Sequence, residues 1–290
     1  MVGATLLFAT MGVCVKLASA SYAAGEIVFY RGLVGVVMAG ALVGLRGGTL
    51  RTTVPAMHFW RSAVGVTSLV LWFHAFAGLP LATAMTLNYM SSVWMALFMI
   101  GGAVLLGSAR VDGRLVAAVL AGFAGVALVL RPTISDEQLW YGLAGLVSGM
   151  FAALAYLQVT ALGRAGEPEG RIVFYFSVGS VAAGAATMVW SGASAHTATG
   201  LALLLAVGVL ATGAQMLMTR AYAIGRTLSN ASLQYLGIVF ATGYGVLLFG
   251  DVLTWSALAG MVLIVAAGLA ATLLRAPSTP ADSRAAGPPP

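Results

Sequence analysis

Residues Ser62–Ala109 read SAVGVTSLVLWFHAFAGLPLATAMTLNYMSSVWMALFMIGGAVLLGSA, a stretch without Asp, Glu, Lys or Arg. A second stretch, Ile172–Thr219, is equally free of charge. A helix needs about 20 residues to cross a hydrocarbon core roughly 30 Å thick. Each stretch therefore predicts two membrane-spanning helices joined by a tight turn. These turns are expected at Gly78-Leu79-Pro80 and at Ser191-Gly192-Ala193-Ser194.

The composition of the whole chain also indicates a membrane protein. Hydrophobic residues make up 60% of the 290 residues and charged residues 8%, whereas about 25% charged is ordinary in soluble domains. So little charge cannot cover the surface of a soluble protein of this size. A transmembrane β-barrel is excluded because the apolar runs are continuous rather than alternating. The sequence predicts an all-α integral membrane protein.

Charged residues, glycine and proline divide the apolar sequence into ten predicted transmembrane helices. Breaks such as Arg46-Gly47-Gly48, Arg131-Pro132 and Gly250-Asp251 mark their ends. Residues 276–290 contain five prolines and no apolar pattern, so we expect a disordered cytoplasmic tail. The expected helices cover 1–19, 26–45, 57–78, 81–107, 113–131, 139–163, 170–191, 199–221, 227–249 and 254–275.

Basic residues predict the orientation, because cytoplasmic loops carry an excess of Lys and Arg. With both termini in the cytoplasm, the inner loops and the tail hold eleven bases and the outer loops hold Arg131. We expect a multi-pass protein of the bacterial inner membrane. A signal-peptidase site at Ala18-Ser19-Ala20 is the disfavoured alternative, since no basic segment precedes it. The eleven bases are Arg46, Arg51, Arg61, Arg110, Arg114, Arg164, Arg171, Arg220, Arg226, Arg275 and Arg284.

Several functional classes lack the residues that they need. The single cysteine, Cys14, excludes an internal disulfide framework. The bases are scattered rather than clustered, which argues against nucleic-acid binding. A Walker loop needs Gly-Lys-(Ser/Thr), and the single lysine, Lys16, does not follow a glycine. His58, His74 and His196 lack metal-ligand spacing, so we expect no bound metal. We also expect no cofactor, and no ATP because the Walker loop is missing.

The chain contains two copies of one unit, because short motifs recur in the same order along it. Gly25 with Ile27-Val28-Phe29-Tyr30 recurs as Gly170 with Ile172-Val173-Phe174-Tyr175. Five matches in order are not easily produced by chance. The other four are Ala75-Phe76-Ala77 with Ala221-Tyr222-Ala223, Leu87-Asn88-Tyr89 with Leu233-Gln234-Tyr235, Gly107-Ser108 with Gly250-Asp251, and Gly125 with Gly268.

Each copy holds five helices, an odd number, so the second copy is expected to be inverted in the membrane relative to the first. The predicted divisions are a first repeat at 1–131, a linker at 132–138 and a second repeat at 139–275. Inverted repeats can exchange conformations, which opens a site near the middle of the membrane alternately to each side. This arrangement predicts a secondary transporter and not an enzyme.

The repeated motifs resemble those of the EamA-type transporters in the drug/metabolite transporter superfamily. The resemblance covers residues 1–275 and includes the Ala-(Phe/Tyr)-Ala turns, the Leu-x-Tyr helices and the ending Gly250-Asp251. One departure is Ser108, where the resemblance implies a glutamate. The resemblance implies movement of a small metabolite, and looks most like bacterial exporters of aromatic and other apolar or neutral amino acids. We expect a monomer in contact with membrane lipid.

Polar and aromatic residues within the helices are candidates for a central cavity. Thr212, Gln215, Thr219 and Tyr222 recur at helical spacing and form one stripe, which lipid would turn inward. The stripe either lines a cavity or forms hydrogen bonds between helices. Aromatic residues either stack on a substrate or belong to interfacial belts, as fits Trp60, Trp140, Trp190 and Trp255. The other cavity candidates are Met11, Trp72, Asn88, Tyr89, Tyr156, Gln234 and Tyr235.

Lys16, Arg31 and His74 have two interpretations each. Because a base in hydrocarbon is costly unless paired or snorkelling, Lys16 and Arg31 either form ion pairs at the outer rim, near Glu26, or attract a substrate carboxylate at the outer vestibule. His74 either couples transport to protons or only packs. All eight acids fall in loops, helix ends or the tail, which favours a facilitator or exchanger over a carboxylate-driven antiporter.

Other functions remain as alternatives. Within the same fold, the chain could take up metabolites, nucleoside-like compounds or vitamins. An intramembrane enzyme is an alternative of another class. An intramembrane aspartyl protease needs Gly-x-Gly-Asp, but Leu248 replaces the first glycine of this motif. A rhomboid-like serine protease needs Gly-x-Ser-Gly, but Leu146 replaces the first glycine of that motif. A channel would conduct without saturation, and a scaffold would not require a duplicated core.

Overall fold

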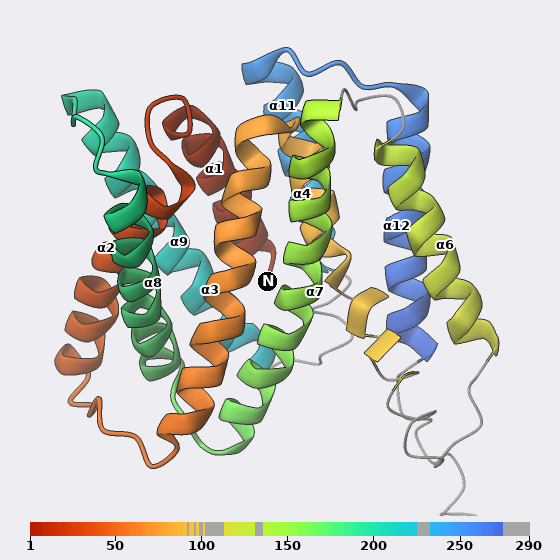
Figure 1. Ribbon diagram of the computed structural model, residues 1–290. Helices are drawn as coiled ribbons and strands as arrows, with labels where there is room; N and C mark the ends of the chain where they lie inside the picture. The colour runs from red at the N-terminus through yellow and green to blue at the C-terminus, as the bar shows by residue number, and fades with distance from the viewer. Residues whose placement is uncertain are drawn as a thin grey trace, which may run out of the picture.

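The computed structural model describes residues 1–91, 93–95, 97–98, 101, 113–130, 136–224 and 233–274. Every regular element within these ranges is an α-helix, as the sequence predicts. Figure 1 shows the helices standing side by side as one bundle. Their bounds are α1 Val2–Ala18, α2 Ala24–Leu45, α3 Pro55–Gly78, α4 Leu81–Tyr89, α6 Gly113–Leu130, α7 Asp136–Arg164, α8 Glu169–Ser191, α9 Ala198–Ile224, α11 Leu236–Phe249 and α12 Trp255–Leu274.

Proline and glycine set several of these helix ends. Pro55 is the first residue of α3, and Pro168 lies directly before α8. Proline suits these positions because the first turn of a helix has no intrahelical partner for its N–H groups. Gly192 ends α8 with φ 76° and Gly250 ends α11 with φ 63°. Both glycines adopt backbone conformations that other residues avoid, so the chain can turn sharply there.

Two helices are shorter than expected, and each has one end at the repeated Leu-x-Tyr motif. α4 ends at Tyr89 and Met90 forms a turn, although the described residues between 91 and 101 are again helical. Leu233 and Gln234 are helical, Tyr235 is a turn, and α11 begins after it. Residues 225–232, most of the predicted linker and the predicted tail 276–290 lie outside the described residues.

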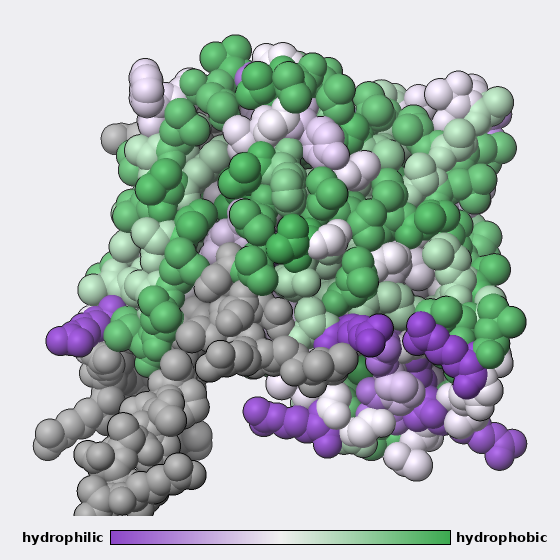
Figure 2. Space-filling view, turned by 180° about the vertical axis from the view of Figure 1, so that it is seen from behind, coloured by the Kyte–Doolittle hydropathy of each residue, from purple (hydrophilic) through white to green (hydrophobic). Residues whose placement is uncertain are grey.

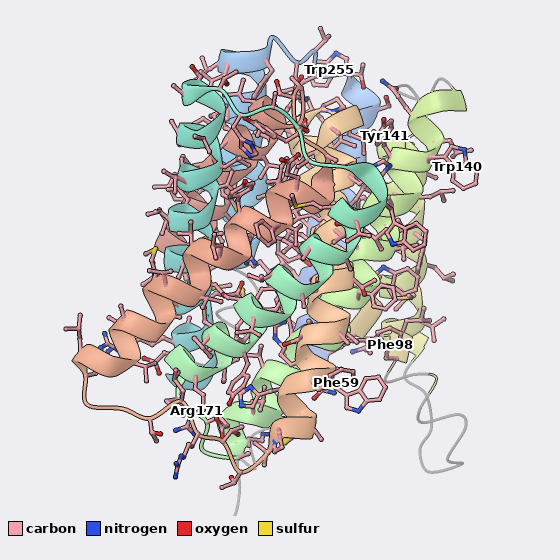
Figure 3. All side chains as sticks on the ribbon, turned by 60° about the vertical axis from the view of Figure 1, so that its left-hand side comes forward. Phe59, Phe98, Trp140, Tyr141, Arg171 and Trp255 are labelled. Atoms are coloured by element: carbon pink, nitrogen blue, oxygen red, sulfur yellow. The ribbon has the colours of Figure 1, made fainter. Side chains whose placement is uncertain are left out.

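The surface of the bundle is that of a membrane protein. Apolar residues cover most of the face in Figure 2, and hydrophilic residues gather at one end. Among the described residues, α2, α7, α8 and α9 contain segments long and apolar enough to cross a membrane. Phe59 and Trp140 point away from the bundle (Figure 3), and their exposed fractions are 66% and 70%. Trp60, Trp190 and Trp255 are also exposed near helix ends, as interfacial belts require.

The hydrophilic end, here called the basic end, is formed by the α2–α3 loop, the α7–α8 loop and the helix ends beside them. The turns that follow α1, α3, α8 and α11 lie at the other end of the bundle, the upper end in Figure 1. The described bases of the basic end are Arg46, Arg51, Arg114, Arg164, Arg171 and Arg220. This grouping agrees with the loops that the sequence places on one side.

The core lies where α1, α3 and α4 meet. Every residue of α4 is buried, and Phe73 and Phe76 of α3 are fully enclosed. Around this centre, α2 packs on α8, α3 on α7, α1 on α9 and α6 on α12. The pair α6 and α12 stands at one edge of the bundle (Figure 1).

α2 and α8 pack antiparallel and very closely, because glycines face the partner backbone. A Cβ atom on Gly32 would lie 2.7 Å from the backbone nitrogen of Val181, and one on Gly184 would lie 2.6 Å from Cα of Phe29. Close backbone approach through small residues is a common source of stability between helices in lipid. These two helices therefore form a tightly fitted pair beside the functional site.

Candidate functional site

A central cavity lies between α1, α2, α3, α4, α7, α8 and α9. The volume open to water is about 60 Å³, room for a few water molecules at roughly 10–15 Å³ each. A metabolite therefore needs the walls to move apart. The walls combine apolar and aromatic side chains (Phe8, Met11, Leu69, Trp72, Phe176 and Met218), neutral polar ones (Ser68, Asn88, Tyr156 and Gln215) and two cations (Arg31 and Arg61).

The two cations come from different helices and meet at one aromatic ring. The guanidinium carbon of Arg31, in α2, lies 4.9 Å from the centre of the Phe176 ring in α8. The corresponding carbon of Arg61, in α3, lies 4.2 Å from the same centre. Both arginines are buried, with exposed fractions of 4% and 3%. Attraction between a cation and a ring face thus positions two positive charges in one wall of the cavity.

No carboxylate whose side chain the structure describes neutralises these two arginines. Glu26, Glu167, Glu169 and Asp251 each form an ion pair or a hydrogen bond elsewhere, and none of the four lines the cavity. Glu26 pairs with His196, Glu167 with His58 and Arg171, Glu169 with Arg46, and Asp251 with Lys16. The cavity therefore carries an uncompensated positive charge with respect to these acids.

Three nitrogen atoms of the two arginines have no hydrogen-bond acceptor among the residues that the structure describes. Arg31 donates from Nη1 to Ser180 Oγ at 3.5 Å. Nε of Arg31, and Nε and Nη1 of Arg61, are buried without a partner. Buried donors without acceptors are rare in proteins and call for an explanation. A ligand with acceptor oxygens would satisfy them.

The neutral polar wall is held by hydrogen bonds between helices. Asn88 donates from Nδ2 to Ser148 Oγ at 3.0 Å, and Ser68 donates from Oγ to the carbonyl oxygen of Ser148 at 2.8 Å. These bonds join α3 and α4 to α7. They fix the amide of Asn88 at the cavity wall.

A second network fixes Tyr156. Gln234 donates from Nε2 to Tyr156 Oη at 3.2 Å and accepts from Tyr222 Oη at 3.0 Å. The rings of Tyr156 and Tyr222 stack with their centres 5.8 Å apart. Gln234 and Tyr222 therefore support the cavity indirectly, by orienting Tyr156.

Five of the eleven predicted cavity residues line the cavity, and the other six do not. Those in the wall are Met11, Trp72, Asn88, Tyr156 and Gln215. Thr212 donates to the carbonyl oxygen of Gly208 and packs near Gly35 of α2, which is a helix-packing role. Thr219 is buried, Tyr89 lies against Gly237, and Tyr235 borders an apolar groove between α11 and α12.

Arg31, Lys16 and His74, for which the sequence left two interpretations each, lie in three different places. Arg31, expected at the outer vestibule, lies instead in the cavity wall. Lys16 donates from Nζ to the carbonyl oxygen of Leu79 at 2.8 Å and lies 4.0 Å from Asp251 Oδ1, away from the cavity lining. His74 is exposed in the last turns of α3 and stacks on Tyr141 with ring centres 4.7 Å apart.

Sequence reasoning missed Arg61, which it counted among the bases of the inner loops. The structure places it inside α3, almost two turns after Pro55, and buries it in the cavity wall. The signal was available, because proline favours the first position of a helix and so moves the start of this helix from residue 57 to Pro55, which places Arg61 deeper within it. Phe176 and Ser68 were also missed, since nothing distinguishes them from ordinary residues of a buried helix.

One cluster of hydrogen bonds closes the basic end, and we call it the Glu167 cluster. The carboxylate of Glu167 accepts from Thr52 Oγ1 at 2.8 Å, from His58 Nε2 at 3.1 Å and from Arg171 Nη1 at 3.1 Å. Arg171 also donates to the carbonyl oxygen of Thr49, and it lies beside the α2–α3 loop in Figure 3. The start of α8 is thereby joined to the α2–α3 loop and to α3.

A matching cluster lies at the other end of the bundle, and we call it the Glu26 cluster. Glu26, fully buried in the first turn of α2, accepts from Ser194 Oγ at 2.8 Å and lies 3.4 Å from His196 Nε2. It joins the start of α2 to the α8–α9 loop. Tyr30 packs on His196 here, and Tyr175 packs on His58 in the Glu167 cluster.

Comparisons with known proteins place the chain among transporters. No family model matches it. Over 269 residues the chain is 34% identical to the pseudopaline exporter CntI of Pseudomonas aeruginosa, and the match covers 92% of each chain. It is 29% identical over 174 residues to a riboflavin transporter of Rhizobium johnstonii, covering 60% of this chain and 56% of that one.

A solved crystal structure shares the fold. Its TM-score is 0.65 at 20% sequence identity, and the match covers 94% of this chain and 96% of that one. The named relatives are transporters rather than enzymes. Given the identity to the exporter over nearly the full length of both chains, this multi-pass bacterial membrane protein belongs to the transporter family that includes the pseudopaline exporter of Pseudomonas aeruginosa.

Proposed function

We propose that this protein is a secondary transporter of the EamA type that exports small organic metabolites, amino acids among them, by alternating access through the central cavity. The observation that carries the proposal is the cavity itself. Helices from both predicted repeats enclose it, and it has apolar walls with a few convergent polar groups, as a binding site for a small molecule requires. The exporters among its relatives support the same function.

In the proposed mechanism two inverted halves exchange conformations, and the packing of the helices supports that arrangement. If the first to fifth helices of each repeat are matched, α2 packs on its own counterpart α8, α4 on α11, and α6 on α12. The contact between α3 and α7 corresponds to the contact between α9 and α1 in the matched repeats. In the same way, the contact between α2 and α9 corresponds to the contact between α8 and α3. A two-fold relation between the repeats accounts for every one of these pairs.

The two end clusters support a mechanism that closes one side at a time. Each joins the start of the second helix of one repeat to the loop after the second helix of the other, and each contains a glutamate, a hydroxyl group and a histidine. The motif tyrosines Tyr30 and Tyr175 take the same part in both. Breaking one cluster while keeping the other would open the cavity to one side.

The orientation and the substrate complete the proposal. The basic end faces the cytoplasm of the inner membrane, in agreement with the excess of arginine there. The rings of Phe8 and Trp72, with centres 6.3 Å apart, give the cavity an aromatic wall that suits aromatic and other apolar side chains. Uptake of a vitamin is the second candidate function, favoured by the similarity to a riboflavin transporter.

Flux into proteoliposomes tests the proposed function. Radiolabelled tryptophan, phenylalanine, methionine, threonine and glutamate would be measured with and without a pH gradient. We expect saturable flux that is stimulated by substrate on the opposite side. Conduction without saturation would favour a channel, and dependence on the pH gradient would assign His74 to coupling. Absence of flux for every compound, in protein shown to be folded, would contradict export of amino acids.

A further inference from the structure

We propose that the central cavity selects organic acids with two carboxylate groups, one bound by Arg31 and the other by Arg61. This inference rests on the proposed function, because it assigns the substrate class of the same cavity. It differs from the preference for neutral amino acids that the aromatic wall alone suggests.

The charge balance of the cavity is the first argument. Burying a charge is costly unless an opposite charge and hydrogen bonds accompany it, and intramembrane bases generally mark the path of a substrate or ion. Arg31 and Arg61 place two positive charges at one ring and repel each other electrostatically. The acids whose side chains are described are engaged at the ends of the bundle. A dianion supplies both missing partners.

The unpaired donors are the second argument. The face contact with Phe176 holds both guanidinium groups but accepts none of their N–H groups in an ordinary hydrogen bond. Nε of both arginines and Nη1 of Arg61 therefore stay without acceptors in the described part of the chain. The planar fork of a guanidinium matches the two oxygens of a carboxylate. Two forks in one wall match two carboxylates.

A neutral amino acid satisfies this site less well. It carries one carboxylate, so one guanidinium remains unpaired. Its ammonium group also needs acceptors, and only neutral oxygens such as those of Asn88 and Gln215 are present among the described lining residues. An ammonium close to two guanidinium groups is repelled as well. The net charge of the ligand therefore decides its affinity.

The opposite wall determines the rest of the ligand. Phe8, Met11 and Trp72 line the cavity together with the arginines. An apolar or aromatic group attached to the two carboxylates would fill this side. 2-Phenylsuccinate, which has two carboxylates and one ring, is therefore a suitable probe, and phenylalanine and 3-phenylpropionate are its matched analogues with a single carboxylate.

Binding to the purified protein in detergent tests the inference without requiring transport. Dissociation constants at pH 7.5 would be obtained from the rise in melting temperature with ligand concentration. We expect 2-phenylsuccinate to bind at least about tenfold more tightly than either analogue, because it adds a charge-assisted hydrogen-bond pair. Arg31→Gln and Arg61→Gln should each abolish this preference. Arg46→Gln, at the exposed basic end, should retain it.

Two further measurements separate binding from structure and carboxylate from phosphate. Without ligand, Arg31→Gln and Arg61→Gln should melt no lower than the wild type, since each removes a buried unpaired charge. Arg61→Lys keeps the charge without the fork and should weaken binding of 2-phenylsuccinate while leaving the fold intact. Phenyl phosphate, a dianion on a single group, should bind more weakly than 2-phenylsuccinate.

The outcomes that overturn the inference are specific. Equal affinity for phenylalanine and 2-phenylsuccinate in the wild type would overturn it, as would a preference that survives both arginine variants. Tighter binding of phenyl phosphate would assign the arginines to a phosphate group instead. Saturable flux of neutral amino acids without any preference for the dianion would discard this inference and keep the proposed function.

Discussion

His58 Nε2 lies 3.1 Å from Glu167 Oε2, and the two side chains are only 2% and 3% exposed. Thr52 and Arg171 bind the same carboxylate. One buried group thus connects the α2–α3 loop, α3 and the start of α8. A carboxylate with three donors in a buried place is a strong local constraint, so its charge should matter for stability.

Replacement of Glu167 tests this constraint. Glu167→Gln keeps the size but weakens three charge-assisted hydrogen bonds, and we expect the free energy of unfolding to fall by about 1.5–3 kcal/mol. The control is Glu169→Gln, because Glu169 lies 3.8 Å from the exposed Arg46 and such pairs contribute under about 1 kcal/mol. Both variants would be compared by melting temperature in detergent. Equal losses in the two would contradict the prediction.

The stabilisation by Glu167 should depend on pH. Burial raises the pKa of Glu167, but the hydrogen bonds from Thr52, His58 and Arg171 outweigh burial and hold this pKa below its usual value of 4.5. The stabilisation is therefore complete above about 4.5 and is lost as the pH falls through the lower pKa of the folded state. The difference in melting temperature between the wild type and Glu167→Gln should shrink below that pH. A difference that grows in acid would refute this assignment.

The fit between α2 and α8 predicts a matched pair of glycine variants. Gly184→Ala places a Cβ 2.6 Å from backbone atoms of Phe29, whereas Gly44→Ala meets no described residue within 4 Å. We expect the first to destabilise the protein by about 1–3 kcal/mol through overpacking. The second should be neutral or slightly stabilising, because alanine favours a helix over glycine. Melting curves that are equal for the two variants would show that the helices can separate without cost.

Much of the fold was predictable because lipid makes strong demands on a sequence. Uncharged stretches identify helices, and the turns at Gly192 and Gly250 are visible as breaks. The interruption at Met90 was not predictable, since nothing in an apolar run reveals where a helix is locally broken. The pairing of α2 with α8 depends on which glycines face each other, and this is a property of the packed bundle.

The site was harder to predict, because polar residues in apolar helices serve both packing and binding. Met11, Trp72 and Gln215 reach the cavity, but Thr212, from the same stripe as Gln215, bonds within its own helix. Charged residues within helices were the clearest sequence signal of the cavity. Arg61 was assigned to an inner loop because the helix was expected to start only four residues before it, whereas α3 begins at Pro55. A base inside a helix is informative only when the helix bounds are right.

Lys16 gives a prediction about a residue that lies outside the cavity lining. Its ammonium donates to Leu79 and lies 4.0 Å from Asp251, which in turn accepts from the backbone N–H of Leu81. We expect Lys16→Met and Asp251→Asn to show a coupling energy under about 1 kcal/mol in a double-mutant cycle, because the pair is long and partly exposed. Lys16→Met should leave the affinity for substrate unaltered. A weakened affinity with normal expression would return Lys16 to the substrate path.

The two end clusters predict opposite effects on access to the cavity. A cysteine at Ser68, a lining residue, would report access to a membrane-impermeant thiol reagent in a Cys14→Ser background. Glu167→Gln weakens closure of the basic end, so labelling from that side should rise and labelling from the other side should fall. Glu26→Gln should have the reverse effect, because its partners lie on the α8–α9 loop at the other end.

This opposition distinguishes alternating access from simple loosening of the bundle. An equilibrium between two states, each closed at a different end, shifts toward one state when the closure of the other is weakened. The ratio of labelling from the two sides is therefore the informative quantity. The exposed pair of Arg46 and Glu169 supplies the control, since Glu169→Gln removes a charge at the basic end without touching the Glu167 cluster. A rise in labelling from both sides in both cluster variants would mean that the clusters hold the fold together without gating it.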